Sequence, residues 1–97
     1  MIQFVKDFLK LNGYQEVIQD KLPETFDIIC PVFRNDKSIV QIYTGYLDPN
    51  NNLEDKFQMY MVTFNDGIMY SPDFNVYWLI GVLTYYDLID KNYKLPN

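Results

Sequence analysis

The chain has 97 residues, of which 48% are hydrophobic and 18% aromatic, and its 13 carboxylates against 8 cations give a net charge of −5. A chain of this length is expected to form one domain, here residues 1–97, and to bury only about two thirds of the surface that its unfolded form exposes. Because histidine is absent, the usual general base near neutral pH and the commonest metal ligand are missing. The composition therefore argues against an enzyme.

The single cysteine and the first residues indicate a reducing compartment. Cys30 lies in an apolar run and has no second cysteine to pair with, so we expect it to be a buried hydrophobic residue. Lys6, Asp7 and Lys10 interrupt the N-terminal segment where a signal peptide would need an unbroken apolar stretch. The longest apolar run, residues 76–83, is far shorter than the ~20 residues that cross a bilayer. We expect a cytoplasmic protein that does not bind membranes.

The amino-acid composition suggests an origin for the gene. Phe, Tyr, Met, Ile, Asn and Lys make up 45 residues, whereas Gly, Ala, Arg and Pro make up only 10 and alanine is absent. The first set has AT-rich codons. The composition therefore predicts a gene from a low-GC bacterium, or from a phage or mobile element that lives in one. The expected location is the bacterial cytoplasm, or the cytoplasm of the host if the gene is phage-encoded.

The chain begins with an amphipathic pattern. Residues 2–11 place apolar side chains at helical spacing, and Gly13 follows the last of them as a helix stop. We predict a first helix over this segment. The following segment, residues 14–24, is compatible with an extended connection or with a short strand.

The period changes to two from Thr25 onward, which predicts strands. Short turn signals at residues 35–36 and 65–67 suit tight hairpins, and a longer polar loop covers residues 48–55. Pro31 cannot donate to a ladder, so the first of these strands is expected at an edge or with a bulge. The predicted strand segments, of which the fourth is short, are residues 25–33, 38–47, 57–64 and 68–70.

The last third of the chain predicts a second helix. Ser71, Pro72 and Asp73 form a helix start with a cap, a first-turn proline and an acidic first turn. Residues 74–91 then carry apolar side chains at a period of 3.6, although residues 76–83 also favour a strand, which stays open as the alternative. The predicted fold is α+β: an N-terminal helix, an antiparallel meander of three or four strands and a C-terminal helix, with both helices on one face of the sheet.

No group of residues predicts catalysis, and we expect neither a catalytic nor a metal site and no cofactor. Cys30 has no histidine to activate it, and Ser71 has a capping role. The loop 48–55 has oxygen side chains at alternate positions, as a calcium loop has. However, Leu53 stands where such a loop needs glycine, and Met59 stands where it needs a bidentate glutamate.

Aromatic content and acidic charge point to binding of a protein. Both faces of the predicted strands carry apolar side chains, so the face without helices is expected to leave Tyr and Met for a partner, unless these residues only enlarge a small core. Residues 45–90 hold one cation, Lys56, against seven carboxylates. Such a field attracts basic surfaces and repels nucleic-acid phosphates. We therefore expect no direct contact with nucleic acid.

The leading hypothesis is a non-enzymatic, acidic protein-binding module. It would be a small inhibitor from a phage or mobile element, directed against the host or its defences, that blocks a basic, nucleic-acid-binding surface of a partner protein. Aromatic residues would form the contact and carboxylates would steer the approach. The predicted partner-binding residues are Tyr43, Tyr46, Asp48, Glu54, Asp55, Tyr60 and Asp66.

Three other interpretations remain open. A toxin-neutralising immunity protein has the same kind of composition. A homodimer, or another homo-oligomer with no further partner, would bury the open sheet face or the apolar start of the last helix against a second copy. A small enzyme or ligand carrier would use an aromatic pocket around Tyr77, Trp78 and Tyr85.

Overall fold

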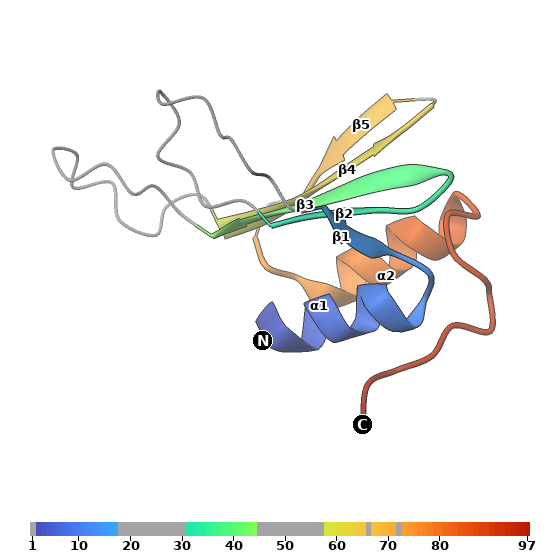
Figure 1. Cartoon of the computed structure of the whole chain (residues 1–97). Coiled ribbons are helices and arrows are strands. Elements are labelled where there is room, and N and C mark those ends of the chain that lie inside the picture. Colours follow the sequence, from blue (N-terminus) through green and yellow to red (C-terminus); the bar gives the residue numbers. More distant parts are fainter. Residues whose placement is uncertain (1, 18–30, 45–57, 66, 72) are drawn as a thin grey trace, which may run out of the picture.

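A computed structural model of the chain describes residues 2–17, 31–44, 58–65, 67–71 and 73–97. Figure 1 shows one layer of strands with both helices below the same face of the sheet. The predicted α+β fold is confirmed, with five strands in place of three or four. The elements in chain order are α1 (Ile2–Leu11), β1 (Gln15–Val17), β2 (Val32–Arg34), β3 (Ser38–Thr44), β4 (Gln58–Phe64), β5 (Gly67–Tyr70) and α2 (Val76–Tyr85).

Helix α1 has the predicted bounds and the predicted stop. It buries Val5, Phe8 and Leu9 under the sheet. Gly13 then adopts a φ of +94°, and the backbone N–H of Tyr14 donates to the carbonyl of Leu9 over 2.9 Å. This is the C-terminal motif in which a left-handed residue lets the chain fold back over the last turn. It leads directly into β1.

The sheet is an antiparallel meander in which every strand pairs with its neighbour in sequence, in the order β1-β2-β3-β4-β5. The β3–β4 pairing is the longest, and it sets Val40 opposite Val62 and Ile42 opposite Tyr60. All four side chains are fully buried on the face that the helices cover. Strand alternation therefore turns Ile39, Gln41, Met59 and Met61 to the other face.

Pro31 led us to expect an edge strand or a bulge, but β2 is not at the edge of the sheet. β1 pairs with it, so β1 forms the edge. Pro31 stands one residue before β2, where its carbonyl accepts a hydrogen bond from the N–H of Ile42 over 2.9 Å. A ladder donor is not needed at that position. The rest of the strand predicted over residues 25–33, including Cys30, lies outside the described residues, as does the loop 48–55.

The predicted start of the second helix is wrong. Ser71 is buried and extends the β4–β5 pairing: its Oγ accepts from the N–H of Tyr60 over 2.7 Å and donates to the carbonyl of Asp73 over 2.6 Å. The N-cap is Asn75, whose Oδ1 accepts from the N–H of Trp78 over 3.1 Å. Ser71 and Asn75 are both residue types that cap helices. Ser71 bonds to the sheet, and Asn75 caps the helix.

Helix α2 also ends earlier than the predicted Lys91. Asp87 adopts a φ of +55°, and the N–H of Leu88 donates to the carbonyl of Leu83 over 2.8 Å. Both leucines are buried. This is the same terminating motif as at Gly13, with an aspartate in the left-handed position.

We expect Asp87→Gly to stabilise the fold by about 0.5 to 1 kcal/mol, because glycine adopts positive φ without strain and the change removes a negative charge from a helix C-terminus. Urea unfolding measures this difference. Asp87→Asn separates the two contributions, since it removes the charge but keeps a side chain. A less stable Asp87→Gly variant would contradict the assignment of this helix end.

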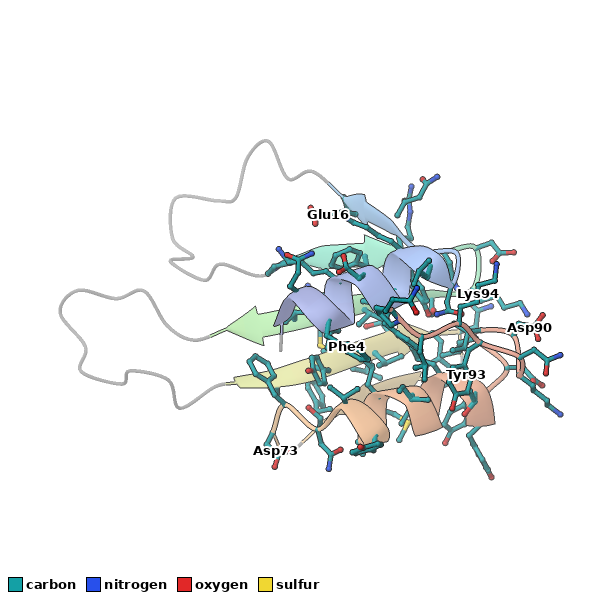
Figure 2. The ribbon with its side chains drawn as sticks, turned by 90° about the horizontal axis from the view of Figure 1, so that it is seen from below. Phe4, Glu16, Asp73, Asp90, Tyr93 and Lys94 are labelled. Carbon is teal, nitrogen blue, oxygen red and sulfur yellow. The ribbon has the colours of Figure 1, made fainter. Side chains whose placement is uncertain are left out.

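The C-terminal segment returns beneath the helices. The Asn12 side chain accepts from the N–H of Lys94 and donates to its carbonyl, over 2.9 and 2.8 Å. The ring of Tyr93 meets the ring of Phe8 edge-on, with centroids 5.9 Å apart. These contacts hold the segment beside α1, as Figure 2 shows from below.

Candidate protein-docking surface

Helix α2 contains no charged residue and is apolar on nearly all sides. It packs on the sheet through Leu79, Val82 and Leu83, which are buried. On its opposite side Tyr77 is 87% exposed and Tyr85 is 79% exposed. A helix that is apolar all round is normally buried on every side. The exposed side of α2 is therefore the strongest candidate for a contact surface in the described part of the chain.

We call Tyr77, Gly81, Thr84 and Tyr85 the outer face of α2. The positions 77, 81 and 85 follow each other at intervals of four residues and so share one side of the helix. The Oγ1 of Thr84 donates back to the carbonyls of Ile80 and Gly81, over 2.8 and 3.1 Å. Since this hydroxyl is already bonded, the tyrosine hydroxyls are the polar side-chain groups that the outer face offers to a partner.

Tyr85 is held by neighbouring rings. It meets Tyr86 edge-on with centroids 4.8 Å apart, and Tyr86 in turn packs on Phe64 of β4 at 4.8 Å. This row of rings joins the end of the outer face to the sheet. A side chain that is oriented in the free protein loses less conformational entropy on binding. Tyr85 thus combines high exposure with a ring contact to its neighbour.

An apolar groove runs beside the outer face, between α2, α1 and the C-terminal segment. Its volume is about 830 Å³. Figure 2 shows Phe4 and Tyr93 between the two helices. Asp73 is the only charged residue in the lining, which is otherwise mainly apolar, with Phe4, Phe74, Tyr77, Ile80, Tyr93 and Leu95 as its large side chains.

A second groove, of about 760 Å³, lies at the end of the sheet where β2 turns into β3. Its polar groups serve the fold. The Nζ of Lys37 donates to the carbonyl of Asp87 over 3.0 Å, and Asn12 ties down Lys94 as described above. These bonds join the β2–β3 turn and the end of α1 to the chain beyond α2.

No protein-family model matches the chain, and no curated protein or solved structure shows significant similarity to it. Neither helix in the described part of the chain has the length and apolarity needed to cross a membrane. Within the same residues, no three Cys, Asp or Glu side chains are grouped so that they could hold a metal ion. The surface must be interpreted from its own residues.

Of the residues predicted to bind a partner, the structure places Tyr60 in the core. Its exposed fraction is 0%, and its ring stacks on that of Phe74 with centroids 5.1 Å apart. Burial, with a smaller contribution from the negative charge of Asp73, raises the pKa of Tyr60 to about 12. The prediction that Tyr60 contacts a partner is therefore wrong, because its side chain does not reach the surface.

The other predicted residues are not brought together by the described structure. Tyr43 lies in β3 opposite Met59, and Tyr46, Asp48, Glu54, Asp55 and Asp66 lie outside the described residues. The neighbours of Asp66 are at one end of β4, whereas the loop holding Asp48, Glu54 and Asp55 joins the other end. Seven residues of strand, about 20 Å, separate the two ends.

The sheet face without helices is partly as predicted. Met59 and Met61 are half-buried there, and Ile68 and Tyr70 of β5 are exposed by 54% and 55%. Figure 1 shows that neither helix covers this face. On α2, the sequence predicted only the apolar start of the last helix as a surface for a second copy, and it did not single out the outer face as a whole. The signals that could have revealed it are the uncharged stretch over residues 74–86 and the glycine within it.

The aromatic pocket considered from the sequence is not formed as expected. Tyr77 lines the apolar groove, but Trp78 and Tyr85 do not. Trp78 packs partly buried against the core, and Tyr85 is exposed to solvent. Since Trp78 lies outside the groove lining, its fluorescence is a poor reporter for a ligand there.

Proposed function

We propose that the chain is a non-enzymatic, acidic module that docks on a basic surface of a partner protein. In this proposal it is a small cytoplasmic inhibitor, encoded by a phage or mobile element, that covers a nucleic-acid-binding surface of its target. The observation that carries the proposal is the way the fold distributes charge along the sheet.

The described residues are electrically balanced, with six carboxylates and six cations. The whole net charge of −5 therefore belongs to residues 18–30, 45–57 and 66, which hold seven carboxylates and two lysines. The first two of these segments account for −4 of it. They join β1 to β2 and β3 to β4, and antiparallel pairing brings all four of these strand ends to the same end of the sheet.

Such a concentration of one sign of charge favours a basic partner. It raises the rate of encounter with cationic surfaces and disfavours nucleic acid, whose phosphates carry the same sign. Aromatic and methionine side chains on the helix-free sheet face, such as Tyr70 and Met61, suit the apolar part of such a contact.

The buried polar groups support a role without catalysis. The hydroxyls of Ser38 and Ser71 are bonded to groups of the fold. Burial raises the pKa of both Tyr14 and Tyr60, so each phenol is neutral at physiological pH. A neutral, buried phenol is neither a base nor a nucleophile.

Charge reversal tests the proposal. We expect Glu54→Lys combined with Asp55→Lys to slow association with a partner captured from host lysate and then purified, by about tenfold or more at low salt. The difference should shrink as salt is added, while dissociation changes less. Stopped-flow or surface-based kinetics measures both rates.

The matched control reverses two carboxylates at the opposite end of the sheet. Asp36→Lys combined with Asp90→Lys changes the net charge by the same amount, and both side chains are exposed. If the acidic sheet end steers the partner, the control retains most of the association rate. Equal rates for the two double variants would show that only total charge matters and would contradict the proposal.

A further inference from the structure

Gly81 occupies the centre of the outer face of α2, and no contact with the described residues requires a glycine there. It is helical, and a Cβ atom built on it would meet no other atom within 4 Å. Glycine in a helix interior is less stable than alanine. Since the described structure would accept a side chain here, the glycine is explained by something that approaches α2 from outside.

The residues around Gly81 are arranged symmetrically. Tyr77 precedes it by four residues and Tyr85 follows it by four, so the Cα atom of each tyrosine lies about 6 Å along the helix axis from that of the glycine. If a second α2 crosses at Gly81 in the antiparallel direction, Tyr77 of one copy lies beside Tyr85 of the other, and the converse pair forms by symmetry. A surface that fits itself in this way is the requirement for a two-fold interface.

The apolar groove supplies a recess for the incoming tyrosine. It borders Tyr77 and Gly81 and includes Phe4 and Leu95. The Tyr85 of a second copy would enter the groove at the level of Tyr77. Tyr85 is prepared for this role by its contact with Tyr86.

The two exposed tyrosines supply more than half of the area that a dimer needs. A buried aromatic side chain covers roughly 150 to 250 Å², so Tyr77 and Tyr85 at 87% and 79% exposure offer roughly 300 Å² per copy. Two copies then contribute roughly 600 Å² of the ~1,000 Å² that a specific interface needs. Leu95, which is 55% exposed, and the other groove residues supply the rest.

The lack of charged residues on α2 allows a second copy as the occupant. Two chains of net charge −5 repel each other, and the uncharged α2 is a place where two copies can meet without placing like charges in contact. We propose that the chain forms a two-fold symmetric dimer in which the outer faces of two α2 helices pack antiparallel and cross at Gly81.

Gly81→Arg tests the interface. The side chain enters open space in the free chain, and arginine is a better helix former than glycine. The fold is therefore retained, as circular dichroism would show. Sedimentation equilibrium is expected to give a dimer for the natural chain at micromolar concentration and at least about a tenfold weaker dimer for Gly81→Arg.

Gln15→Arg is the matched control. It makes the same change of charge at an exposed position of β1, the strand at the far edge of the sheet from β5, and it should dimerise like the natural chain. The proposal fails if the natural chain is monomeric at every concentration, or if Gly81→Arg dimerises as well as Gln15→Arg.

Two further measurements test the geometry and separate this proposal from docking on a basic partner. In a Cys30→Ser background, a short bismaleimide should link a mixture of Tyr77→Cys and Tyr85→Cys chains better than either chain alone. A parallel pair would give the reverse result. Added salt should strengthen the dimer by screening repulsion, whereas it should slow association with a basic partner.

Discussion

Asn35→Ala is expected to lower the free energy of unfolding by about 2 to 3 kcal/mol, a large loss for a residue in a two-residue turn. The Oδ1 of Asn35 accepts from the N–H of Lys37, the N–H of Ser38 and the Oγ of Ser38, over 2.9, 2.7 and 3.0 Å. Its Nδ2 donates to the carbonyl of Leu88 over 2.9 Å. One side chain thus closes the β2–β3 turn and ties it to the chain beyond α2.

The bonds of Asn35 continue into the protein interior. The hydroxyl of Ser38 donates to Asn35, and it also pairs with the hydroxyl of Tyr14. Because the Ser38 proton is already given to Asn35, Tyr14 must be the donor in the second bond. Ser38 and Tyr14 are both buried. Removal of Asn35 therefore leaves the Ser38 hydroxyl without its acceptor in a place where water cannot take over the bond at low cost.

Urea unfolding measures this loss. Asp36→Ala, at the neighbouring exposed turn position, is the control and should change stability by less than about 0.5 kcal/mol. Asn35→Asp keeps the acceptor oxygen but loses the donor to Leu88, so it should fall between the two. If Asn35→Ala and Asp36→Ala are equally stable, the turn does not depend on the carboxamide.

The parts of the fold that the sequence predicts well are those with one strong local signal. Gly13 follows a periodic apolar segment, and no neighbour competes for the role of helix stop. The Asn35 turn is flanked by two β-branched and aromatic runs, and it forms the expected hairpin. In such places local preference and tertiary packing require the same conformation.

The ends of α2 show where local signals fail. Ser71 and Asn75 both suit an N-cap, and only the β4–β5 pairing decides that Ser71 belongs to the sheet. At the other end, Asp87 adopts a left-handed conformation, which aspartate tolerates but which its presence in a sequence does not predict. Burial of Leu88 against the last turn favours that conformation, but without a glycine at the left-handed position the sequence does not mark this helix end.

The candidate site was hard to predict because both sheet faces are apolar. Strand alternation correctly puts Tyr60 and Val62 on one face and Met59 and Met61 on the other. It does not say which face the helices cover. The helices cover the Tyr60 face, so a residue expected at the surface became part of the core. Along the sequence, the excess of carboxylates lies in the second half of the chain. The sheet topology instead joins residues 18–30 and residues 45–57 to strand ends on the same side of the sheet.

The two buried tyrosines are expected to respond in opposite directions to loss of the hydroxyl. Tyr14→Phe removes a bonded donor and should lower stability by about 1 to 2 kcal/mol. Tyr60→Phe should raise it by about 1 kcal/mol, because the Tyr60 hydroxyl is buried and finds no partner among the described residues. Urea unfolding of both variants at neutral pH measures the contrast, and each variant serves as the control for the other.

Alkaline unfolding gives an independent test of Tyr60. Its pKa is raised from 10.0 to about 12, so the folded chain keeps a proton that the unfolded chain releases. The free energy of unfolding is then unaffected by this ionisation below pH 10 and falls as the pH rises from 10 toward 12. Tyr60→Phe should lose less stability over this interval than the natural chain, although Tyr14, whose pKa is raised as well, leaves part of the loss in place. If Tyr60→Phe destabilises the protein at neutral pH, the hydroxyl has a partner in solution; if the variant keeps the alkaline loss unchanged, burial does not raise the pKa of Tyr60.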